Sequence, residues 1–437
     1  MIQIFKQLGR HWSACIAVVV LLFAQAYCDL SLPDYTSKIV DIGIQQGGIE
    51  SPVPETVRDT TLQALELLMS EQDAALAEQW YSAPDADGVR TLSRDTTAAT
   101  PELESAFSTP DVVLYMAAAQ NAATSGASTP AAGDLDAAVA QMTAMVSVPG
   151  AREMLQARLQ EEMSALDDSM ADNLSQQATL LVALEYEAQG IAHDVQLAYL
   201  LRTGGRMLAL TLVMVAVSIA VGFLASRVSA AIGRDLRRDV FGTVVGYSNA
   251  EIEKFSTASL ITRTTNDIQQ VQFVCVILLR MVAYAPILGI GGILHVAEGD
   301  TGLEWIIFVA VAALLLLIAF LMSVAMPKFK LMQTLVDRLN LVSREILTGI
   351  MPIRAFSREA FEEQRFDKAN TDLMKTQLFT NRTMVAMMPF MTLIMNGTSL
   401  LIVWFGGKAM DLGTMQVGEM IAFITYTMQI VMSFLML

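Results

Sequence analysis

Residues that build metal centres and disulfides are scarce in this sequence. Its 437 residues include only three cysteines and three histidines. Cys15, Cys28 and Cys275 lie in or beside apolar stretches, and the histidines lie near no cysteine pair. We therefore expect neither a zinc site nor a disulfide framework.

A nucleotide-binding loop is also absent from the sequence. Such a loop needs the pattern G-x-x-x-x-G-K-[ST], because backbone N–H groups and one lysine must surround the phosphates. The nearest match, Gly406-Gly407-Lys408, is followed by Ala409 and lies beside an apolar stretch, so we expect only a turn there. We also expect that the chain cannot hydrolyse ATP by itself.

Long hydrophobic runs dominate the chain instead. Hydrophobic residues make up 54% of it and the mean hydropathy is +0.47, which is too apolar for a soluble protein of this length. Runs of about 17–25 apolar residues are typical of transmembrane helices. Six such runs predict an all-α polytopic membrane protein, and they lie near Trp12–Cys28, Met207–Ala225, Val271–Val296, Trp305–Met326, Met384–Phe405 and Val417–Leu437.

Charge is unevenly distributed along the chain. The formal net charge is −16, yet residues 49–196 alone hold 24 acidic residues against five arginines and no lysine. Basic residues gather in two polar stretches between apolar runs, at 227–272 and 328–382. Because Lys and Arg concentrate in cytoplasmic loops near span ends, we expect both stretches and the N-terminus in the cytoplasm. The acidic insert, 49–196, is then expected to be extracellular.

The sequence divides into three parts by this pattern. In residues 1–48 we expect a short interfacial elbow helix followed by the first span. Pro33 is expected to end this span, and a helix is expected to resume at 39–44. We expect the insert to form a small helical domain, with loops over 82–110 and 121–133. Apolar residues at helical spacing predict its helices at Thr60–Tyr81, Leu135–Val148, Ala151–Leu166 and Ala178–Leu201. Its role stays open between a lid, a partner-docking site, a cation-concentrating surface and a solvated helical decoration.

The third part, 197–437, holds the other five spans and the two basic stretches, which are too long for simple loops. At ~1.5 Å per residue, a helical hairpin of this length extends roughly 30–40 Å beyond a membrane. In the first hairpin we expect a turn near 248–254 and a returning helix at 257–272. In the second we expect a descending helix over 328–356, a short charged crossing over 357–366 and a returning helix over 367–382.

Four segments carry a family resemblance: LPDYTSKIVDIGI at 32–44, FSTASLITRTTNDIQQVQ at 255–272, EILTGIMPIRAFSREAFEEQRFDKAN at 345–370 and WFGGKAMDLGTMQVGEMIAFITY at 404–426. They resemble the membrane domain of bacterial ATP-binding-cassette (ABC) exporters of the six-helix, multidrug-exporter-like type. The resemblance covers about 1–48 and 200–437. The large insert departs from the family pattern, which has a short loop there.

The resemblance implies a short coupling helix at the tip of each hairpin, which would lie in a groove on a nucleotide-binding domain. Mixed charge with one large apolar side chain suits such docking, although an ordinary solvated turn is the alternative. The implied residues are Asn249, Glu251, Glu253, Lys254 and Phe255 in the first tip, and Arg358, Glu359, Phe361, Glu362, Glu363 and Arg365 in the second. ATP and Mg²⁺ are expected on nucleotide-binding domains outside this chain. Such a domain is expected after residue 437, as in a truncated half-transporter, rather than as a separate subunit.

Several residues within the spans are candidates for a substrate cavity. An intramembrane charge such as Arg280 indicates a function by default, and snorkelling to the interface is the alternative. Methionines recur three or four residues apart on the fifth and sixth spans, which suits a surface for varied apolar ligands but also fits packing or lipid contact. The candidates are Arg280, Met384, Met387, Met388, Met391, Met395, Asn396, Met428 and Met432.

The resemblance implies an ATP-driven exporter in the plasma membrane that moves amphipathic small molecules, lipids or peptides by alternating access. Its expected partners are membrane lipid, nucleotide-binding domains and a second half-transporter, with a heterodimer favoured over a homodimer, and no nucleic acid. The alternative function is a membrane receptor or sensor. In that case the acidic outer domain would bind a ligand and the hairpins would dock a signalling partner.

Overall fold

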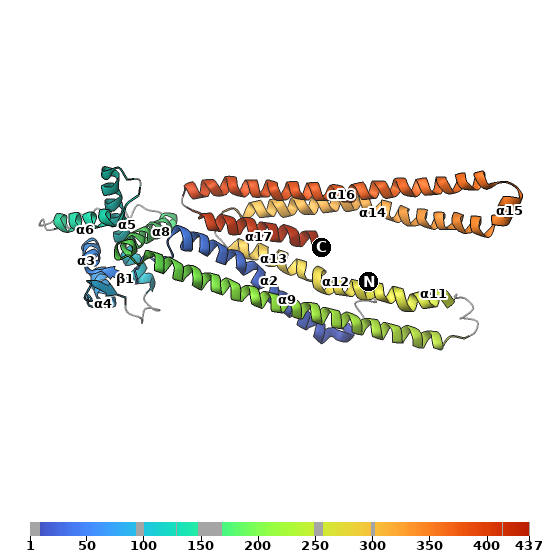
Figure 1. The fold of residues 1–437 in the computed structure, drawn as a ribbon, viewed down its shortest axis with the longest axis horizontal. Coiled ribbons are helices and arrows are strands. Elements are labelled where there is room, and N and C mark those ends of the chain that lie inside the picture. The colour runs from blue at the N-terminus through green and yellow to red at the C-terminus, as the bar shows by residue number, and fades with distance from the viewer. Residues whose placement is uncertain are drawn as a thin grey trace. The chain divides into compact units, whose positions relative to one another are not determined.

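The computed structural model of the chain describes residues 9–92, 100–127, 129–146, 168–248, 257–298, 302–412 and 414–436. Figure 1 labels the helices and strands of these residues, which fall into two compact units. The first unit consists of the described residues of Met1–Leu30, Val217–Gly407 and Ile424–Leu437. The second consists of Ser31–Ala216 and Lys408–Phe423. Each unit is described separately.

Six helical segments among the described residues are long and apolar enough to cross a membrane. This confirms the predicted all-α polytopic fold. The segments are η1 (Gly9–His11) with α2 (Trp12–Lys38) and the π-helix η2 (Ile39–Gln45); α9 (Ala192–Val245); the run α11 (Thr257–Thr262), η4 (Arg263–Asp267), α12 (Ile268–Ile277), η5 (Leu278–Val282) and α13 (Tyr284–Glu298); α14 (Glu304–Thr348); α16 (Glu359–Asp411); and α17 (Val417–Met436).

Proline does not end these helices. Pro33 lies inside α2, and Pro327 and Pro389 lie inside α14 and α16. The prediction that Pro33 ends the first helix is therefore wrong. Transmembrane helices tolerate proline where side chains or neighbouring helices satisfy the freed carbonyl groups, and one such contact at Pro33 is described with the site below.

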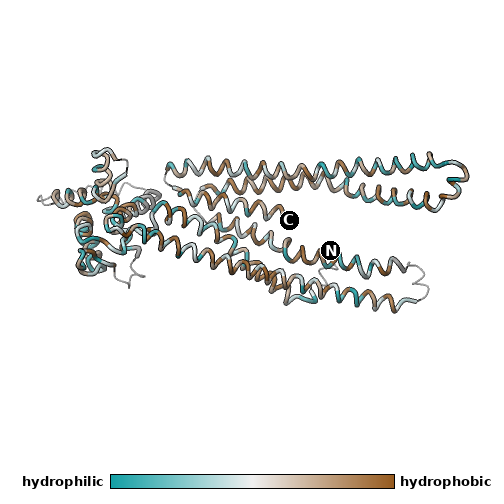
Figure 2. The backbone as a smooth tube through the Cα atoms, in the orientation of Figure 1, coloured by the Kyte–Doolittle hydropathy of each residue, from teal (hydrophilic) through white to brown (hydrophobic). Residues whose placement is uncertain are grey.

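Apolar side chains hold the first unit together in two separate clusters. One joins α2, α9 and the third segment through Val18, Leu22, Val221, Ile232 and Cys275, all nearly or fully buried. The other joins α14, α16 and α17 through Ala310, Leu314, Met391 and Val431. Figure 2 shows hydrophobic residues along most of these helices and more hydrophilic ones where α14 and α16 approach α15 (Ile350–Ala355).

The second hairpin differs from the prediction in the position of its crossing. The separate short helix at its tip is α15, whereas residues 359–366 form the first turns of α16 (Figure 1). Gly349 separates α14 from α15, and Ser357 adopts a left-handed backbone with φ of 50°. The carbonyl of Arg358 then accepts hydrogen bonds from the N–H groups of Phe361 and Glu362, at 3.2 Å each, and starts α16. The predicted bounds of the crossing, 357–366, are therefore wrong.

The insert forms most of the second unit. Its elements are β1 (Thr56–Arg58), α3 (Asp59–Leu68), α4 (Glu71–Trp80), β2 (Val89–Thr91), α5 (Thr100–Ser125), α6 (Ala132–Val146) and α8 (Asp168–Gln189). The two strands pair antiparallel, with Thr56 opposite Thr91. Phe107, Leu62 and Leu135 are completely buried in its apolar core.

Three sequence predictions for the insert need correction. The single helix predicted over Thr60–Tyr81 is two helices, because Ser70 begins α4 by accepting the Asp73 N–H at 3.2 Å. Helix α5 occupies residues 100–110 of the loop predicted at 82–110 and residues 121–125 of the loop predicted at 121–133. The helix predicted over Ala178–Leu201 is divided at Gly190, whose φ of 76° is one that glycine adopts without steric cost. The predicted helix Ala151–Leu166 lies outside the described residues.

Candidate functional site

The tip of the second hairpin is held by a small ionic network. The Arg365 guanidinium pairs with Glu345 on α14 and with Glu362 on its own helix, the latter at 3.3 Å. The Arg358 guanidinium lies over the Phe361 ring, 5.4 Å from its centroid. These contacts orient the charged side chains along the tip.

Large apolar side chains are unusually exposed at this tip. Met351 on α15 is 74% exposed and Phe356, directly after α15, is 78% exposed. A groove of about 440 Å³ lies beside them and is lined by Ser343, Ile346, Leu347, Ile350, Ile353, Glu359, Glu362, Glu363 and Phe366. Apolar side chains clustered on a polar hairpin end are typical of surfaces that contact another protein, a ligand or a membrane.

The residues predicted for the second tip lie at or beside this groove. Glu359, Glu362 and Glu363 line the groove, while Phe361 is 55% exposed. The sequence prediction did not include α15, although its apolar residues next to Gly349 were a visible signal. The residues predicted for the first tip, Asn249, Glu251, Glu253, Lys254 and Phe255, lie outside the described residues.

A second cavity lies among the helices of the first unit. It measures about 330 Å³ and is lined by Asp29, Tyr284, Leu288, Met395, Thr425, Met428, Gln429, Met432, Ser433 and Met436. Three of the predicted cavity residues, Met395, Met428 and Met432, are therefore part of it. We call it the methionine cavity.

The other predicted cavity residues lie elsewhere. Met391 is buried in the α14–α16–α17 cluster, and Met387 packs against the same cluster. Met384, Met388 and Asn396 are exposed on α16. Arg280 is exposed on η5 and is not among the residues that line the methionine cavity.

Sequence reasoning missed the five polar residues that line this cavity, and hydrogen bonds link three of them, Asp29, Tyr284 and Gln429. The Tyr284 hydroxyl donates a hydrogen bond to the Asp29 carboxyl group. The Gln429 side-chain amide donates to the backbone carbonyl of Asp29 at 3.3 Å. That carbonyl is the one left free by Pro33, which lacks the N–H that would bond four residues back. An acidic residue four positions before a proline within an apolar span was the available signal.

Close helix packing forms one wall of the methionine cavity. A Cβ atom added to Gly289 would lie 2.7 Å from the Ser433 hydroxyl, and one added to Gly292 would lie 2.6 Å from Ile430. Small residues allow the backbones of transmembrane helices to approach in this way. Glycines of α13 thus bring it against α17 and place Tyr284 near Gln429.

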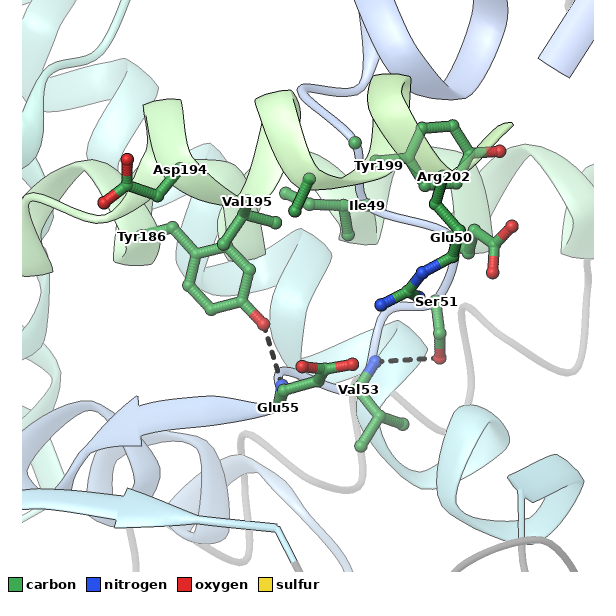
Figure 3. A pocket seen from close by; sticks show the side chains of 12 residues that line it. Ile49, Glu50, Ser51, Val53, Glu55, Tyr186, Asp194, Val195, Tyr199 and Arg202 are labelled. Carbon is green, nitrogen blue, oxygen red and sulfur yellow. Dashed lines mark hydrogen bonds between the residues drawn. The ribbon is translucent and has the colours of Figure 1, made fainter. Parts of the chain in front are cut away.

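The second unit contains a separate pocket of about 420 Å³, between the segment 48–55 and the start of α9 (Figure 3). Glu50, Glu55 and Asp194 contribute carboxyl groups to it, and Arg202 contributes a guanidinium. The Tyr186 hydroxyl accepts a hydrogen bond from the Glu55 N–H at 2.8 Å, and burial raises the pKa of this tyrosine to about 12. This pocket is a candidate ligand site where the insert joins α9.

Comparison with known proteins agrees with the membrane architecture. The family model described as "ABC transporter transmembrane region" matches residues 188–434. An uncharacterized ABC transporter ATP-binding protein of Mycobacterium tuberculosis is 37% identical over 239 residues, which are 55% of this chain and 41% of that protein. The uncharacterized ABC transporter ATP-binding protein YfiB of Bacillus subtilis is 32% identical over 227 residues, which are 52% of this chain and 40% of that protein.

These matches give the chain its place among known proteins. It spans about two fifths of the length of the curated relatives it matches. The family model, in contrast, covers more than half of this chain. The chain is a membrane protein with several spans, and it belongs to the ABC transporter transmembrane region family.

Proposed function

We propose that this chain is the membrane domain of one half of an ATP-driven exporter. It moves amphipathic compounds outward by alternating between inward- and outward-facing states. ATP and Mg²⁺ bind to nucleotide-binding domains outside the chain. The names of the relatives, which describe ATP-binding proteins, support this assignment.

The exposed apolar tip of the second hairpin carries the proposal. Met351 and Phe356 would be costly to leave in water on a polar hairpin unless a partner covers them. We place a nucleotide-binding domain on this surface, with α15 as the coupling helix and the groove lined by Glu359 and Phe366 beside it. The rigid legs α14 and α16 would then carry motion from this domain to the spans.

Other parts of the proposal concern partners and location. A second half completes the transporter, and a heterodimer accommodates the bulky insert of one half more readily than a homodimer accommodates two. The protein lies in the plasma membrane with both hairpins in the cytoplasm and the insert outside, as the distribution of lysine and arginine suggests. The methionine cavity offers flexible, polarisable side chains to amphipathic cargo.

The test is coupled ATP hydrolysis by the full-length protein with its partner half in lipid. Phe356→Ala should lower compound-stimulated hydrolysis several-fold, because an interface side chain of this size contributes about 1–2 kcal/mol or more. Phe223→Ala is the matched control, because Phe223 is also exposed, at 63%, but lies on α9 away from the tip. Equal hydrolysis in both variants would contradict the docking surface, and no hydrolysis in any pairing of folded halves would contradict the exporter itself.

The pocket of the insert favours one alternative, a receptor or sensor. Its carboxyl groups, Arg202 and two tyrosines could hold a polar ligand (Figure 3). If the folded protein hydrolyses no ATP in any pairing but binds a ligand through this pocket, the receptor function replaces the exporter.

A further inference from the structure

The methionine cavity is rich in hydrogen-bond acceptors and has no positive charge of its own. Its ten lining residues include one carboxyl group, that of Asp29, and no basic side chain. Among the described residues, no lysine, arginine or histidine forms an ion pair with Asp29. Its polar neighbours are Tyr284, which donates to it, and Gln25, one turn earlier on α2. Nothing described in the protein balances a charge on this carboxyl group.

A second acceptor in the cavity lacks a donor. The Gln429 amide nitrogen is used by the carbonyl of Asp29, which leaves the amide oxygen as the free end of the side chain. That oxygen is buried and has no hydrogen-bond partner. A buried acceptor without a donor is unfavourable, so a ligand that brings an N–H group would be stabilised here.

Apart from Thr425 and Ser433, the remaining wall of the cavity is apolar and adaptable. Met395, Met428, Met432 and Met436 line it together with Leu288. Methionine has three rotatable bonds and a polarisable sulfur, so such a wall accepts apolar groups of different shapes. The volume of about 330 Å³ lies at the lower end of the range for small-molecule sites.

We propose that the methionine cavity binds a protonated amine that carries an apolar body. The Asp29 carboxylate is the counter-ion of the ammonium group, the Gln429 amide oxygen accepts one of its N–H bonds, and the methionines pack against the apolar body. Low polarity around the site strengthens the ion pair relative to water. This inference rests on the proposed exporter function, for which it names the substrate class.

The test compares two fluorescent probes that differ in charge. Dansylcadaverine carries a primary ammonium group, and its N-acetyl derivative is neutral but keeps an N–H. Binding is measured without nucleotide, by fluorescence titration of the full-length protein and its partner half in nanodiscs, with empty nanodiscs as background. The charged probe should bind roughly ten- to a hundredfold more tightly than the neutral one, as expected for a charge-assisted hydrogen bond.

Variants at Asp29 separate recognition from folding. Asp29→Asn keeps the shape of the side chain and an acceptor for the Tyr284 hydroxyl. It should reduce the preference for the charged probe to about twofold or less and leave the affinity for the neutral probe unchanged. Asp29→Glu keeps the charge and should retain most of the preference. Asp411→Asn removes an exposed carboxylate at the end of α16 and should leave both affinities unchanged.

The outcomes distinguish this proposal from the exporter function. Equal binding of the two probes, binding of neither, or a preference that survives Asp29→Asn overturns the proposed amine site. If the neutral probe stimulates ATP hydrolysis as strongly as the charged one, the exporter stands and the amine site falls. If the Asp29-dependent preference is found but no pairing hydrolyses ATP, the amine site stands and the exporter falls.

Discussion

Glu185 should be the most sensitive residue of the insert. Its side chain is 2% exposed on α8. It accepts hydrogen bonds from the backbone N–H of Arg58 at 2.8 Å, from the Arg58 guanidinium at 3.0 Å and from the Thr61 hydroxyl at 2.8 Å. Gln189 adds a further donor at 2.9 Å. The carboxylate thus ties β1 and α3 to α8 with charge-assisted hydrogen bonds.

The substitution Glu185→Gln keeps the size of the side chain and removes its charge. One carboxylate oxygen becomes an NH₂ group, which faces donors of Arg58 or Thr61 instead of accepting from them. Removing one partner of a buried ion pair costs about 3–5 kcal/mol. We expect the lower value, ~3 kcal/mol, because Arg58 also pairs with Asp136 at 2.7 Å and keeps one partner. This free energy corresponds to an increase on the order of a hundredfold in the equilibrium constant for local opening of these elements.

Hydrogen–deuterium exchange on the full-length protein measures this effect. Amides of β1 and α8 should exchange on the order of a hundredfold faster in Glu185→Gln, since their protection depends on the free energy of local opening. Glu187→Gln makes the same chemical change two residues away on an exposed face of α8 and should leave exchange unchanged. If the amide exchange rates of Glu185→Gln were within about threefold of those of the wild type, the carboxylate would not hold these elements together.

Two further predictions concern a buried acid and a close helix contact. Asp111 is completely buried with both carboxyl oxygens unpartnered, and burial raises its pKa well above the ordinary value. Because the pKa is higher in the folded state, the contribution of this carboxyl group to the folding free energy is fully present below about pH 4. That contribution is lost as the pH rises through the folded pKa. Asp111→Asn should therefore raise the melting temperature of the insert at pH 8 far more than at pH 4, and equal shifts at both pH values in tryptophan-fluorescence melts would refute this. Gly418→Ala should destabilise the protein by about 1–3 kcal/mol. The new Cβ would lie 2.6 Å from the carbonyl oxygen of Ser37, next to the Asp41 carboxylate that accepts a hydrogen bond from the Gly418 N–H. In the same melts Gly407→Ala, whose Cβ meets nothing within 4 Å, should be neutral or stabilising, and equal melting temperatures for the two variants would contradict the steric argument.

Local sequence rules failed where a neighbouring element supplied what the rule assumed to be missing. Pro33 was expected to end a helix, but the carbonyl that it frees accepts a hydrogen bond from Gln429, which is 400 residues distant from Asp29. The loop expected over 82–110 contains the start of α5, because Phe107 and Leu103 are buried in the core of the insert. The nearby residues do not show which distant side chains make either contact.

The candidate site was predicted unevenly for a similar reason. Methionine spacing on the fifth and sixth spans indicated an apolar face on each, and Met395 of α16 with Met428 and Met432 of α17 do line a cavity. Spacing could not tell that Met391 is buried in a cluster between helices, because the same periodicity serves packing and ligand contact. The hairpin crossing was placed too late because its charged residues were more conspicuous than the short apolar helix α15 at Gly349.

The sequence by itself determined the class of this protein, its six membrane-spanning segments, the two long hairpins and the acidic insert. These follow from composition and from the length of apolar runs, because a bilayer accepts only helices of a certain length with few charges. Only the tertiary structure decided which polar groups meet: Asp29 with Tyr284 and Gln429, and Arg58 with Glu185. Such pairs depend on how helices far apart in the chain pack against each other, and local patterns of residues carry no information on that packing.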